Sequence, residues 1–448
     1  TEISEEIGFS HVRYYNKNFK LYFGCTPLQY RKKYYLNEKD FDNSKNITSL
    51  DLNNALNLLS YNLENYDRFN FENKLWNIHI NMNKSLNIFD NNFKDILNLG
   101  EAFDLLIEDN KDILEEVQEE IHFTYGTLEK MFHNDMGVFI DSDFYNWNRA
   151  KSVLEFLYDI DIKPLIVIDN LTFTTEKYRN VLKSFIEYFS ALDFSPIEHL
   201  KFQFSSTINK EIKNNLLDFL NSEFNFEILD NDFIIENTLN QIYDTSYMLP
   251  YIIHSTIFKK DNLSFLRNFD VLEKATNITN EVFIGASGIV NDMGIRKPSY
   301  YAFYLLSKLA DEIVSIDDGC IVTKSDDICA ILLYCHNNDM DSLAKYETIY
   351  KNGILKKSFK KKYSLNIANL KSATRIITYT IDEITGSSYN YWLSMGSPKR
   401  LNKEEKEILH KASYPKIEFK YSKKNSILNI ITELNGYGAK LIILRNIK

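Results

Sequence analysis

Residues 147–204 read WNRAKSVLEFLYDIDIKPLIVIDNLTFTTEKYRNVLKSFIEYFSALDFSPIEHLKFQF. Two short apolar runs, at residues 163–168 and 199–204, follow amphipathic stretches at residues 147–158 and 176–191. Short apolar runs predict buried strands, whereas apolar residues spaced three and four apart predict helices. Helix and strand in alternation are typical of a parallel sheet with helical crossovers. This stretch therefore predicts an α/β domain.

The alternation starts earlier, with strand-like runs at residues 94–99 and 122–128 around a helical stretch at residues 102–121. After a helix at residues 300–309 the pattern changes to strand-like runs separated by turns, which predicts a β-sandwich interrupted by one helix at residues 403–412. Asn435-Gly436 predicts a turn between the last two runs. The runs are residues 320–324, 328–336, 360–367, 375–381, 416–421, 427–433 and 439–444.

The composition is that of a folded protein, with 44% hydrophobic and 25% charged residues among 448. This length allows two or three domains, and no apolar run approaches the roughly 18 residues of a membrane span. The four cysteines show no CxxC pairing, and the histidines show no metal-ligand spacing, so we expect reduced thiols and no metal site. No glycine-rich phosphate loop is present, so no cofactor is expected.

The net charge of −10 is unevenly distributed. Residues 7–37 contain six basic residues and no acidic one, and with three glutamates before them the segment carries +3 while the rest carries −13. A short basic end on an acidic body suggests contact with nucleic acid, although a basic stretch is as often a solvated face.

The N-terminal segment has the pattern of two helices around a tight turn. Gly8 can end a short first helix, and Ser10 can cap a second helix whose apolar face is Tyr15, Phe19 and Phe23. The opposite face of that second helix presents residues 11–14 and Lys17. This is the plan of a helix-turn-helix, in which the second helix reads DNA.

The run Gly8-Phe9-Ser10, Tyr14-Tyr15, Phe19-Lys20, Gly24, Thr26-Pro27 and Tyr30-Arg31 resembles the signature that ends the DNA-binding domain of AraC/XylS regulators. The resemblance implies that residues 10–23 form the recognition helix of the second of two motifs. Thr1 is not an initiator methionine, and we expect the first motif to precede it. The alternative is a helical hairpin without a DNA role. The implied contacts to double-stranded DNA are His11, Val12, Arg13, Tyr14, Lys17, Lys20, Arg31 and Lys32, the last three toward phosphates.

Landmarks farther along resemble glycoside hydrolase family 39, the β-xylosidase group, including forms fused to AraC-type domains in staphylococcal regulators. The strongest match is Gly294-Ile295-Arg296-Lys297-Pro298-Ser299-Tyr300-Tyr301-Ala302-Phe303. The resemblance implies a multidomain α/β plus β protein with a partial helix-turn-helix, a degenerate TIM-type barrel and a C-terminal β-sandwich. The expected boundaries are residues 1–40 for the end of the DNA-binding domain, 41–90 for a connector, 91–312 for the barrel and 313–448 for the sandwich.

The catalytic carboxylates of that family are missing from the positions where the resemblance implies them. The resemblance implies an acid/base at the end of the fourth strand and a nucleophile at the end of the seventh, and retaining hydrolysis needs both carboxyl groups. Alignment on Phe202 places Ser206 and Thr207 at the first position, and counting back from Asp244 places Asn231 at the second. Only about two dozen residues separate these positions, enough for one helix at residues 210–220, so we expect a barrel reduced to about six strands. Nearby acids, interpreted as polar loop residues, are Asp230, Asp232 and Glu236.

The sequence therefore predicts a cytoplasmic DNA-binding transcription regulator with an inactive glycosidase-like domain for sensing, dimerisation or scaffolding. The alternative is an active xylosidase-like hydrolase; a sugar-binding protein without a regulatory role is a third. No catalytic residue, cofactor or metal is assigned, and no membrane partner is expected. A carbohydrate effector and a homodimer remain open, and Tyr125, Phe132 and Trp147 either stack on a sugar or, as we favour, belong to the core.

Overall fold

The computed structural model describes residues 12–23, 26–27, 30, 75–141, 144–192, 197–224, 226–234, 239–259, 263–275, 278, 280–336, 360–370, 372–424 and 427–446. The chain divides into two compact units, Thr1–Phe69 and Asn70–Lys448. Each unit is described by itself.

The first unit contains helix α2 (Val12–Phe23), which confirms the described part of the predicted second helix. The rings of Tyr15 and Phe19 lie 5.7 Å apart, and Phe19 meets Tyr30 edge-on at 5.5 Å. The carbonyl of Thr26 accepts a hydrogen bond from the Tyr30 amide at 2.8 Å, as in a helical turn. The predicted aromatic face is thus present at Tyr15 and Phe19. The first helix and the turn at Gly8 lie outside the described residues.

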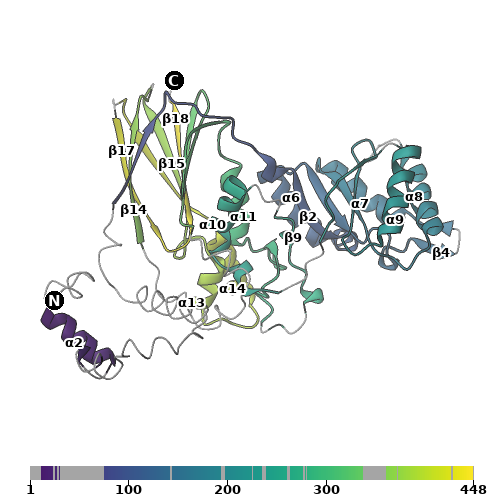
Figure 1. The fold of residues 1–448 in the computed structure, drawn as a ribbon, viewed down its shortest axis with the longest axis horizontal. Coiled ribbons are helices and arrows are strands. Elements are labelled where there is room, and N and C mark those ends of the chain that lie inside the picture. The colour runs from purple at the N-terminus through teal and green to yellow at the C-terminus, as the bar shows by residue number, and fades with distance from the viewer. Residues whose placement is uncertain are drawn as a thin grey trace, which may run out of the picture. The chain divides into compact units, whose positions relative to one another are not determined.

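A seven-stranded parallel sheet forms one part of the second unit, in the order β10-β9-β2-β3-β6-β7-β8 (Figure 1). The predicted strands and crossover helices are confirmed to within a few residues, whereas β8, β9 and β10 were not predicted. A small hairpin, β4 (Phe139–Asp141) with β5 (Phe144–Tyr145), follows β3. The strands are β2 (Ile96–Glu101), β3 (Tyr125–Glu129), β6 (Lys163–Ile168), β7 (Lys201–Phe204), β8 (Glu227–Ile228), β9 (Arg267–Phe269) and β10 (Gly288–Val290); the helices are η2 (Ala102–Leu106), α6 (Glu108–Ile121), α7 (Asn148–Asp159), α8 (Thr175–Ser190) and α9 (Lys210–Phe219).

The two faces of this sheet differ in chemistry because side chains alternate along each strand. Leu128, Ile166 and Phe202 belong to the hydrophobic core that also contains residues of the covering helices. Their neighbours Thr127 and Gln203 are equally buried but polar, and they face the other way. The inner face of the sheet therefore carries the polar Thr127 and Gln203 beside the apolar Leu165 and Val167.

One crossover connects β7 with its neighbour β8. Helix α9 is the crossover, and β8 pairs directly with β7 in parallel, Lys201 with Glu227 and Phe202 with Ile228. The single helix predicted between the two catalytic positions is confirmed. The expected count of six strands was one too low for the whole sheet, because the short strand β10 adds to the edge beyond β9.

Two further sheets pack against a common apolar core and confirm the predicted β-sandwich. The predicted turn has Gly436 at φ 64°, but it joins strands of different sheets instead of closing a hairpin. The six-stranded antiparallel sheet has the order β11 (Glu312–Asp317), β12 (Cys320–Lys324), β13 (Ile328–Tyr334), β18 (Ala439–Asn446), β15 (Thr374–Ile381) and β16 (Lys416–Ser422); the three-stranded sheet has the order β1 (Leu75–Asn81), β14 (Lys360–Ala368) and β17 (Ile427–Asn435).

Strand β1 corrects the expected connector at residues 41–90. Residues 41–74 lie outside the described residues, but β1 pairs in parallel with β14, from Leu75 opposite Lys362 to Asn81 opposite Ala368. Its inward residue Ile80 is buried in the sandwich core. The sequence analysis missed this strand because its partner lies nearly 300 residues farther along the chain, and local pattern carries no sign of such pairing.

The stretch quoted above at residues 294–303 is structural. Pro298 starts helix α11 (Pro298–Leu306), which packs against α10 (Met248–His254), while α13 (Ser388–Ser394) and α14 (Lys403–Ser413) pack on each other. The Lys297 ammonium is fully buried, 2.6 Å from a carboxylate oxygen of Asp244 and 2.6 Å from one of Asp270. Arg296 binds Glu120 of α6 through two nitrogens at 2.8 and 3.2 Å. Both cations therefore tie this segment to distant parts of the second unit.

Candidate functional site

Acidic side chains gather where the parallel strands end, the edge at which TIM-barrel enzymes place their active sites. Glu101 ends β2, Glu129 ends β3 and Asp169 directly follows β6. Asp104 lies in η2, which follows β2. Glu129, Asp104 and Asp169 are buried, with exposed fractions of 1%, 2% and 6%. The acidic side chains at this edge, called the acidic edge below, are therefore the first candidates for catalytic groups.

Each of these carboxylates has a basic partner. Lys130 Nζ lies 2.7 Å from Glu101 Oε1. Lys274 Nζ lies 2.8 Å from Glu101 Oε2 and 2.6 Å from Asp104 Oδ2. The carboxylates of Glu101 and Asp104 are thus bound by ammonium groups from two different loops.

Glu129 is also bound by a cationic side chain, whereas Asp169 is held by a backbone amide. The Arg267 Nη2 atom of β9 donates to both Glu129 oxygens, at 3.0 and 3.2 Å. Asp169 Oδ2 accepts from the Lys130 backbone amide at 2.9 Å and lies 3.4 Å from His133 Nε2. A hollow of about 320 Å³ beside these groups is lined by Glu101, Asp104, Lys130, Arg267 and Lys274, among other residues. Ion pairs therefore link the acidic side chains at the strand ends to basic side chains from neighbouring loops and β9.

The pKa values reflect this balance of burial and pairing. Burial raises the pKa of Glu129 above its usual range, and the charge of Arg267 only partly offsets this effect. Burial also raises the pKa of Asp104 against the hydrogen bond from Lys274. Burial alone would also raise the pKa of Glu101. The hydrogen bonds that Glu101 accepts from Lys130 and Lys274 outweigh burial, so its pKa is lowered. A raised carboxyl pKa suits a general acid, yet each group here is already bound by a cation.

The positions implied for catalysis hold neutral side chains next to the paired strands β7 and β8. The Ser205 hydroxyl lies 2.9 Å from the Thr207 hydroxyl, and Ser206 is exposed. The Gln203 amide donates to the Asn231 carbonyl at 3.0 Å, so Asn231 lies beside β7. Thr207 therefore follows β7 and Asn231 follows the neighbouring strand β8, and the two positions that the resemblance implies carry a hydroxyl and an amide.

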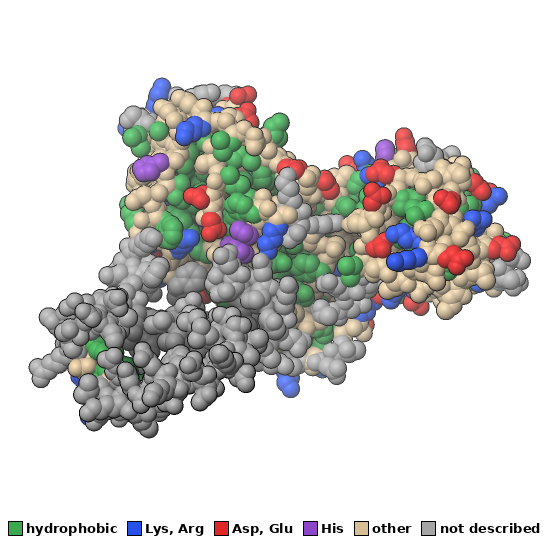
Figure 2. All heavy atoms as spheres, viewed as in Figure 1, with side chains coloured by type: hydrophobic (Ala, Val, Ile, Leu, Met, Phe, Trp, Pro, Cys, Tyr) green, Lys and Arg blue, Asp and Glu red, His purple; other side chains and the backbone are tan. Residues whose placement is uncertain are grey.

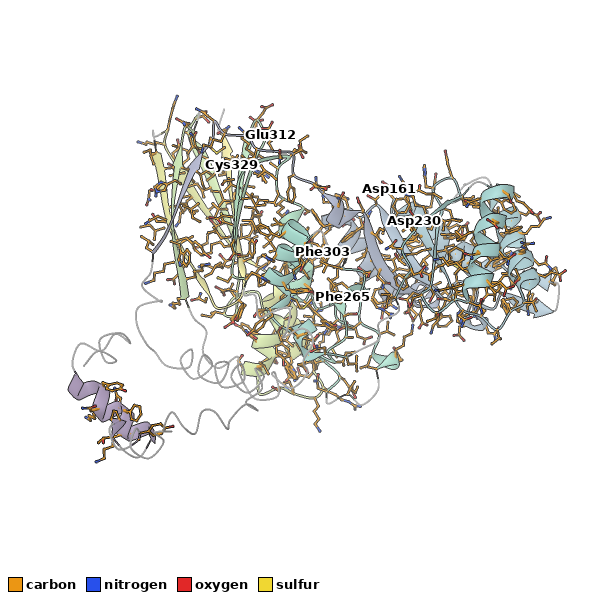
Figure 3. The ribbon with its side chains drawn as sticks, in the orientation of Figure 1. Asp161, Asp230, Phe265, Phe303, Glu312 and Cys329 are labelled. Carbon is orange, nitrogen blue, oxygen red and sulfur yellow. The ribbon has the colours of Figure 1, made fainter. Side chains whose placement is uncertain are left out.

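The acids near Asn231 are surface residues, as interpreted from the sequence. Asp232 is 44% exposed and forms an ion pair with Lys213 of α9. Asp230 is exposed and belongs to the part of the second unit that contains the parallel sheet (Figure 3), and Glu236 lies outside the described residues. Neither described acid points from a buried position toward Thr207.

The three aromatic candidates belong to the core or lie away from the strand ends. Phe132 and Trp147 are each 3% exposed, and their rings meet edge-on 6.2 Å apart. Tyr125 begins β3, at the opposite end of the sheet from the acidic edge, and its ring lies 4.5 Å from Lys201 Nζ. The preferred interpretation of Phe132 and Trp147 as core residues is confirmed.

The residues predicted to contact DNA are only partly described. Val12, Arg13 and Tyr14 form the first turn of α2, and Lys17 and Lys20 are exposed on the same helix. His11, Arg31 and Lys32 lie outside the described residues. The structure therefore brings Lys17 and Lys20 onto one solvent-facing helix, as a DNA-reading helix requires.

Among the described residues, no group of three metal-ligating side chains is found, and no helix is long and apolar enough to cross a bilayer. Cys320, Cys329 and Cys335 are free thiols in the sandwich core. Burial raises the pKa of Cys320 and of Cys329 to about 12.

Sequence reasoning missed the ion-pair network of Glu101, Glu129 and Arg267. A usable signal was present for the two glutamates, since each directly ends a strand-like run. Arg267 could not be found in this way, because its strand has only three residues and no alternation.

Two family models match the chain. That of the bacterial regulatory helix-turn-helix proteins of the AraC family matches residues 1–32, and that of glycosyl hydrolases family 39 matches residues 179–427. The β-xylosidase of Caldicellulosiruptor saccharolyticus is 27% identical over 183 residues, which are 39% of this chain and 34% of that protein. An uncharacterised HTH-type transcriptional regulator of Staphylococcus aureus strain N315 is 22% identical over 240 residues, 51% of this chain and 30% of that protein. The chain thus spans about a third of the length of these relatives.

Solved structures share the fold of the second unit. A monomeric β-xylosidase from Caulobacter crescentus CB15 superposes with a TM-score of 0.70 at 14% identity, covering 83% of this chain and 100% of that one. The family 39 enzyme of Xanthomonas axonopodis pv. citri gives 0.71 at 12% identity, covering 83% and 97%. The expected TIM-type and sandwich architecture is confirmed. Since the family 39 model covers more than half of the 448 residues, this chain belongs to glycosyl hydrolases family 39 and carries an AraC-family helix-turn-helix segment at its N-terminus.

Proposed function

We propose that this chain is part of a DNA-binding transcription regulator of the AraC/XylS type whose family 39 domain does not hydrolyse glycosides. The domain serves instead in sensing, dimerisation or scaffolding, and the protein works in the cytoplasm, where its DNA is. The match of residues 1–32 to the AraC family and the similarity to HTH-type regulators support the regulatory part of the proposal.

One observation carries the inactive part of the proposal: the implied catalytic positions hold Thr207 and Asn231. Retaining hydrolysis needs two carboxyl groups about 5 Å apart, one to protonate the leaving oxygen and one to attack the sugar. A threonine hydroxyl and an asparagine amide supply neither a proton donor of suitable pKa nor an anionic nucleophile. Glu101, Asp104 and Glu129 at the strand ends are engaged by Lys130, Lys274 and Arg267.

For the DNA-binding part, α2 would enter the major groove. We propose that Arg13 reads a base edge, with His11, Val12, Tyr14 and Lys17 beside it. Lys20, Arg31 and Lys32 would bind phosphates and position the helix.

A working glycosidase is the second candidate, favoured by one specific observation. Glu129 is buried at a strand end and has a raised pKa, which is the property of a general acid. The likeness to a β-xylosidase would then extend to activity on xylosides. Arg267 argues against this second candidate, because it already binds both Glu129 oxygens that a substrate would need.

The test of the regulatory function is DNA binding by the full-length protein. Its affinity for double-stranded DNA should fall steeply with salt, because the basic side chains displace counterions from phosphates. Arg13→Ala should weaken binding to the preferred sequence by about 1 to 3 kcal/mol and reduce sequence preference. A protein that binds no DNA sequence above background at low salt would contradict this function.

A further inference from the structure

Strand β16 forms one edge of the six-stranded sheet of the sandwich. It pairs with β15 over its whole length, and among the described residues no strand pairs with its outer side. The other edge of the sheet, at β11, is covered by the preceding chain: the Leu86 amide donates to the Ile313 carbonyl at 2.8 Å, and Ile88 forms a bridge with Glu312. An edge strand presents unpaired amide and carbonyl groups to any further strand. Of the two edges, β16 is therefore the one that is open to pairing.

The open edge carries exposed apolar side chains on one face. Ile417, Phe419 and Tyr421 alternate with polar residues, so they share a face of the sheet. They are 46%, 69% and 63% exposed. Phe419 lies opposite Ile377 of β15 and Ile417 opposite Tyr379, and both β15 residues are part of, or pack against, the large core that includes the parallel sheet. These three residues of β16, called the apolar row below, thus continue a buried face out to the open edge.

The sequence of β16, Lys-Ile-Glu-Phe-Lys-Tyr-Ser, is complementary to itself when two copies run antiparallel. A twofold axis through Phe419 sets this ring opposite the same ring of the second copy, and sets Ile417 opposite Tyr421. On the other face, the axis sets Glu418 of each copy opposite Lys420 of the other. Aromatic pairs and opposite charges that face each other directly stabilise a sheet. Both faces of the strand therefore favour the same pairing.

Other registers of the same strand are less favourable. Residues that lie opposite each other share a face, so a twofold axis must pass through a residue. An axis through Glu418 sets two glutamates opposite each other and Lys416 opposite Lys420, and an axis through Lys420 sets two lysines opposite each other; like charges in these positions are destabilising. An axis nearer either end of the strand pairs fewer residues. The charges of β16 therefore select the register centred on Phe419.

Within one chain, the charges of β16 have little else to bind. Glu418 Oε1 lies 3.3 Å from Lys416 Nζ, and both side chains are about half exposed. An ion pair of this kind contributes little to the stability of a single chain, because water screens it. Glu418 is thus available to a second cation across the edge.

We propose that β16 is a dimerisation strand, through which two copies of this chain pair antiparallel about an axis at Phe419 and join their six-stranded sheets into one. The pairing satisfies the outward amide and carbonyl groups of both copies and removes part of the apolar row from water. The inference rests on the proposed function in one respect, since it selects dimerisation among the roles proposed for the family 39 domain. Two joined chains carry two DNA-binding segments, which bind a site of two half-sites more tightly than one segment does.

The same charges limit the assembly to two chains of one kind. An isologous contact uses the open edge of both copies, so neither β16 edge remains for a third chain. Lysines on an edge discourage pairing with unrelated strands. Lys420 discourages such pairing, while Glu418 of the second copy makes the specific pairing favourable.

The test measures the mass of the purified chain in solution by sedimentation velocity. The range is about 1 to 200 µM, because a contact centred on one strand pair is smaller than a standard interface and binds less tightly. The disruptive variant is Phe419→Asp. Its matched control is Ile431→Asp on β17, because Ile431 is 68% exposed and lies in the other sheet of the sandwich. Glu418→Lys, Lys420→Glu and the double variant test the register.

We expect dimers of the unaltered chain and of Ile431→Asp, and monomers of Phe419→Asp throughout the range. Each single charge variant should raise the dimer Kd at least about tenfold, because both pairs between Glu418 and Lys420 become repulsive. The double variant exchanges the two charges and should restore the dimer, and an equimolar mixture of the two single variants should form dimers as well. Melting curves verify that every variant is folded.

A chain that stays monomeric throughout the range, or a dimer that Phe419→Asp leaves intact, would overturn the inference. So would single charge variants that dimerise normally, or a double variant that does not recover. Failure of the full-length protein to bind DNA, or hydrolysis of a glycoside by the chain, would instead refute the proposed function, so the two failures are distinct.

Discussion

The buried triad of Lys297, Asp244 and Asp270 should dominate the stability of the second unit, and Lys297→Met tests this directly. The ammonium lies 2.6 Å from each carboxylate, and all three side chains are at most 1% exposed. It also donates to the Ala286 carbonyl at 2.9 Å. Removal of the cation leaves two buried carboxylates without a counter-charge, a change that costs about 3 to 5 kcal/mol.

The loss should depend on pH in a defined direction. Burial raises the pKa of Asp270 to about 7, above the roughly 3.9 of an unfolded aspartate. A carboxyl with a raised folded pKa stabilises the fold most at low pH and loses this contribution as the pH rises from about 4 to about 7. Without Lys297, both carboxyl pKa values rise further, so the deficit of the variant should be larger at pH 8 than at pH 5.

The assay is urea unfolding at both pH values, followed by circular dichroism. Lys308→Met serves as the control, because the Lys308 ammonium lies over the Tyr304 ring at 4.0 Å, a contact that contributes about 1 kcal/mol. If Lys297→Met does not fold, adding Asp244→Asn and Asp270→Asn should restore part of the stability by removing the unpaired charges. A loss below about 1 kcal/mol at pH 8, or a loss that shrinks as the pH rises, would refute this reasoning.

Three other predictions concern packing, thiol chemistry and DNA. Gly288→Ala should destabilise the second unit by about 1 to 3 kcal/mol or more, seen as a lower melting temperature, because a Cβ there would lie 2.4 Å from the Asp270 amide nitrogen. Cys320 and Cys329 should resist iodoacetamide at pH 8 in the folded protein and react after denaturation, as followed by peptide mass spectrometry, because burial raises each pKa to about 12. For full-length protein, the affinity of Arg13→Ala should fall most on the preferred DNA sequence; an equal loss on all sequences would make Arg13 a phosphate contact.

Much of the fold could be predicted from periodicity. The strands at residues 163–168 and 320–324 lie where the apolar runs predict them, and the helix at residues 176–191 is observed one residue earlier at each end, as Thr175–Ser190. These elements are long, regular and flanked by clear turns, so local pattern and burial agree. Among the elements that were missed, β8 has two residues and β9 and β10 have three each, and their pairing is set by residues distant in the chain.

Less of the candidate site than of the fold could be predicted from the sequence. The residues at the two implied positions could be read from the sequence, Thr207 by alignment on Phe202 and Asn231 by counting back from Asp244, and the structure places them after the paired strands β7 and β8. The ion pair between Glu129 and Arg267 joins residues 138 apart in the sequence, and no local pattern indicates it.

The face of the second unit that is drawn in Figure 2 carries side chains of both charges. On the side shown in Figure 2, acidic and basic side chains are interspersed over the part that contains α8 and α9, while hydrophobic side chains are visible among the sandwich strands. Single-sign patches that attract DNA are typical of nucleic-acid-binding surfaces. In this account, DNA contact belongs to the first unit.

The central claim is that the family 39 domain does not hydrolyse glycosides, and the most direct test is p-nitrophenol release from a panel of p-nitrophenyl glycosides that includes the β-D-xyloside. The purified chain should release p-nitrophenol no faster than buffer, and Glu129→Gln, Asp230→Ala, Asp232→Ala and Glu236→Ala should behave as the unaltered chain does. Turnover that any one of these substitutions abolishes would contradict the claim, and the chain would then be an active glycosidase.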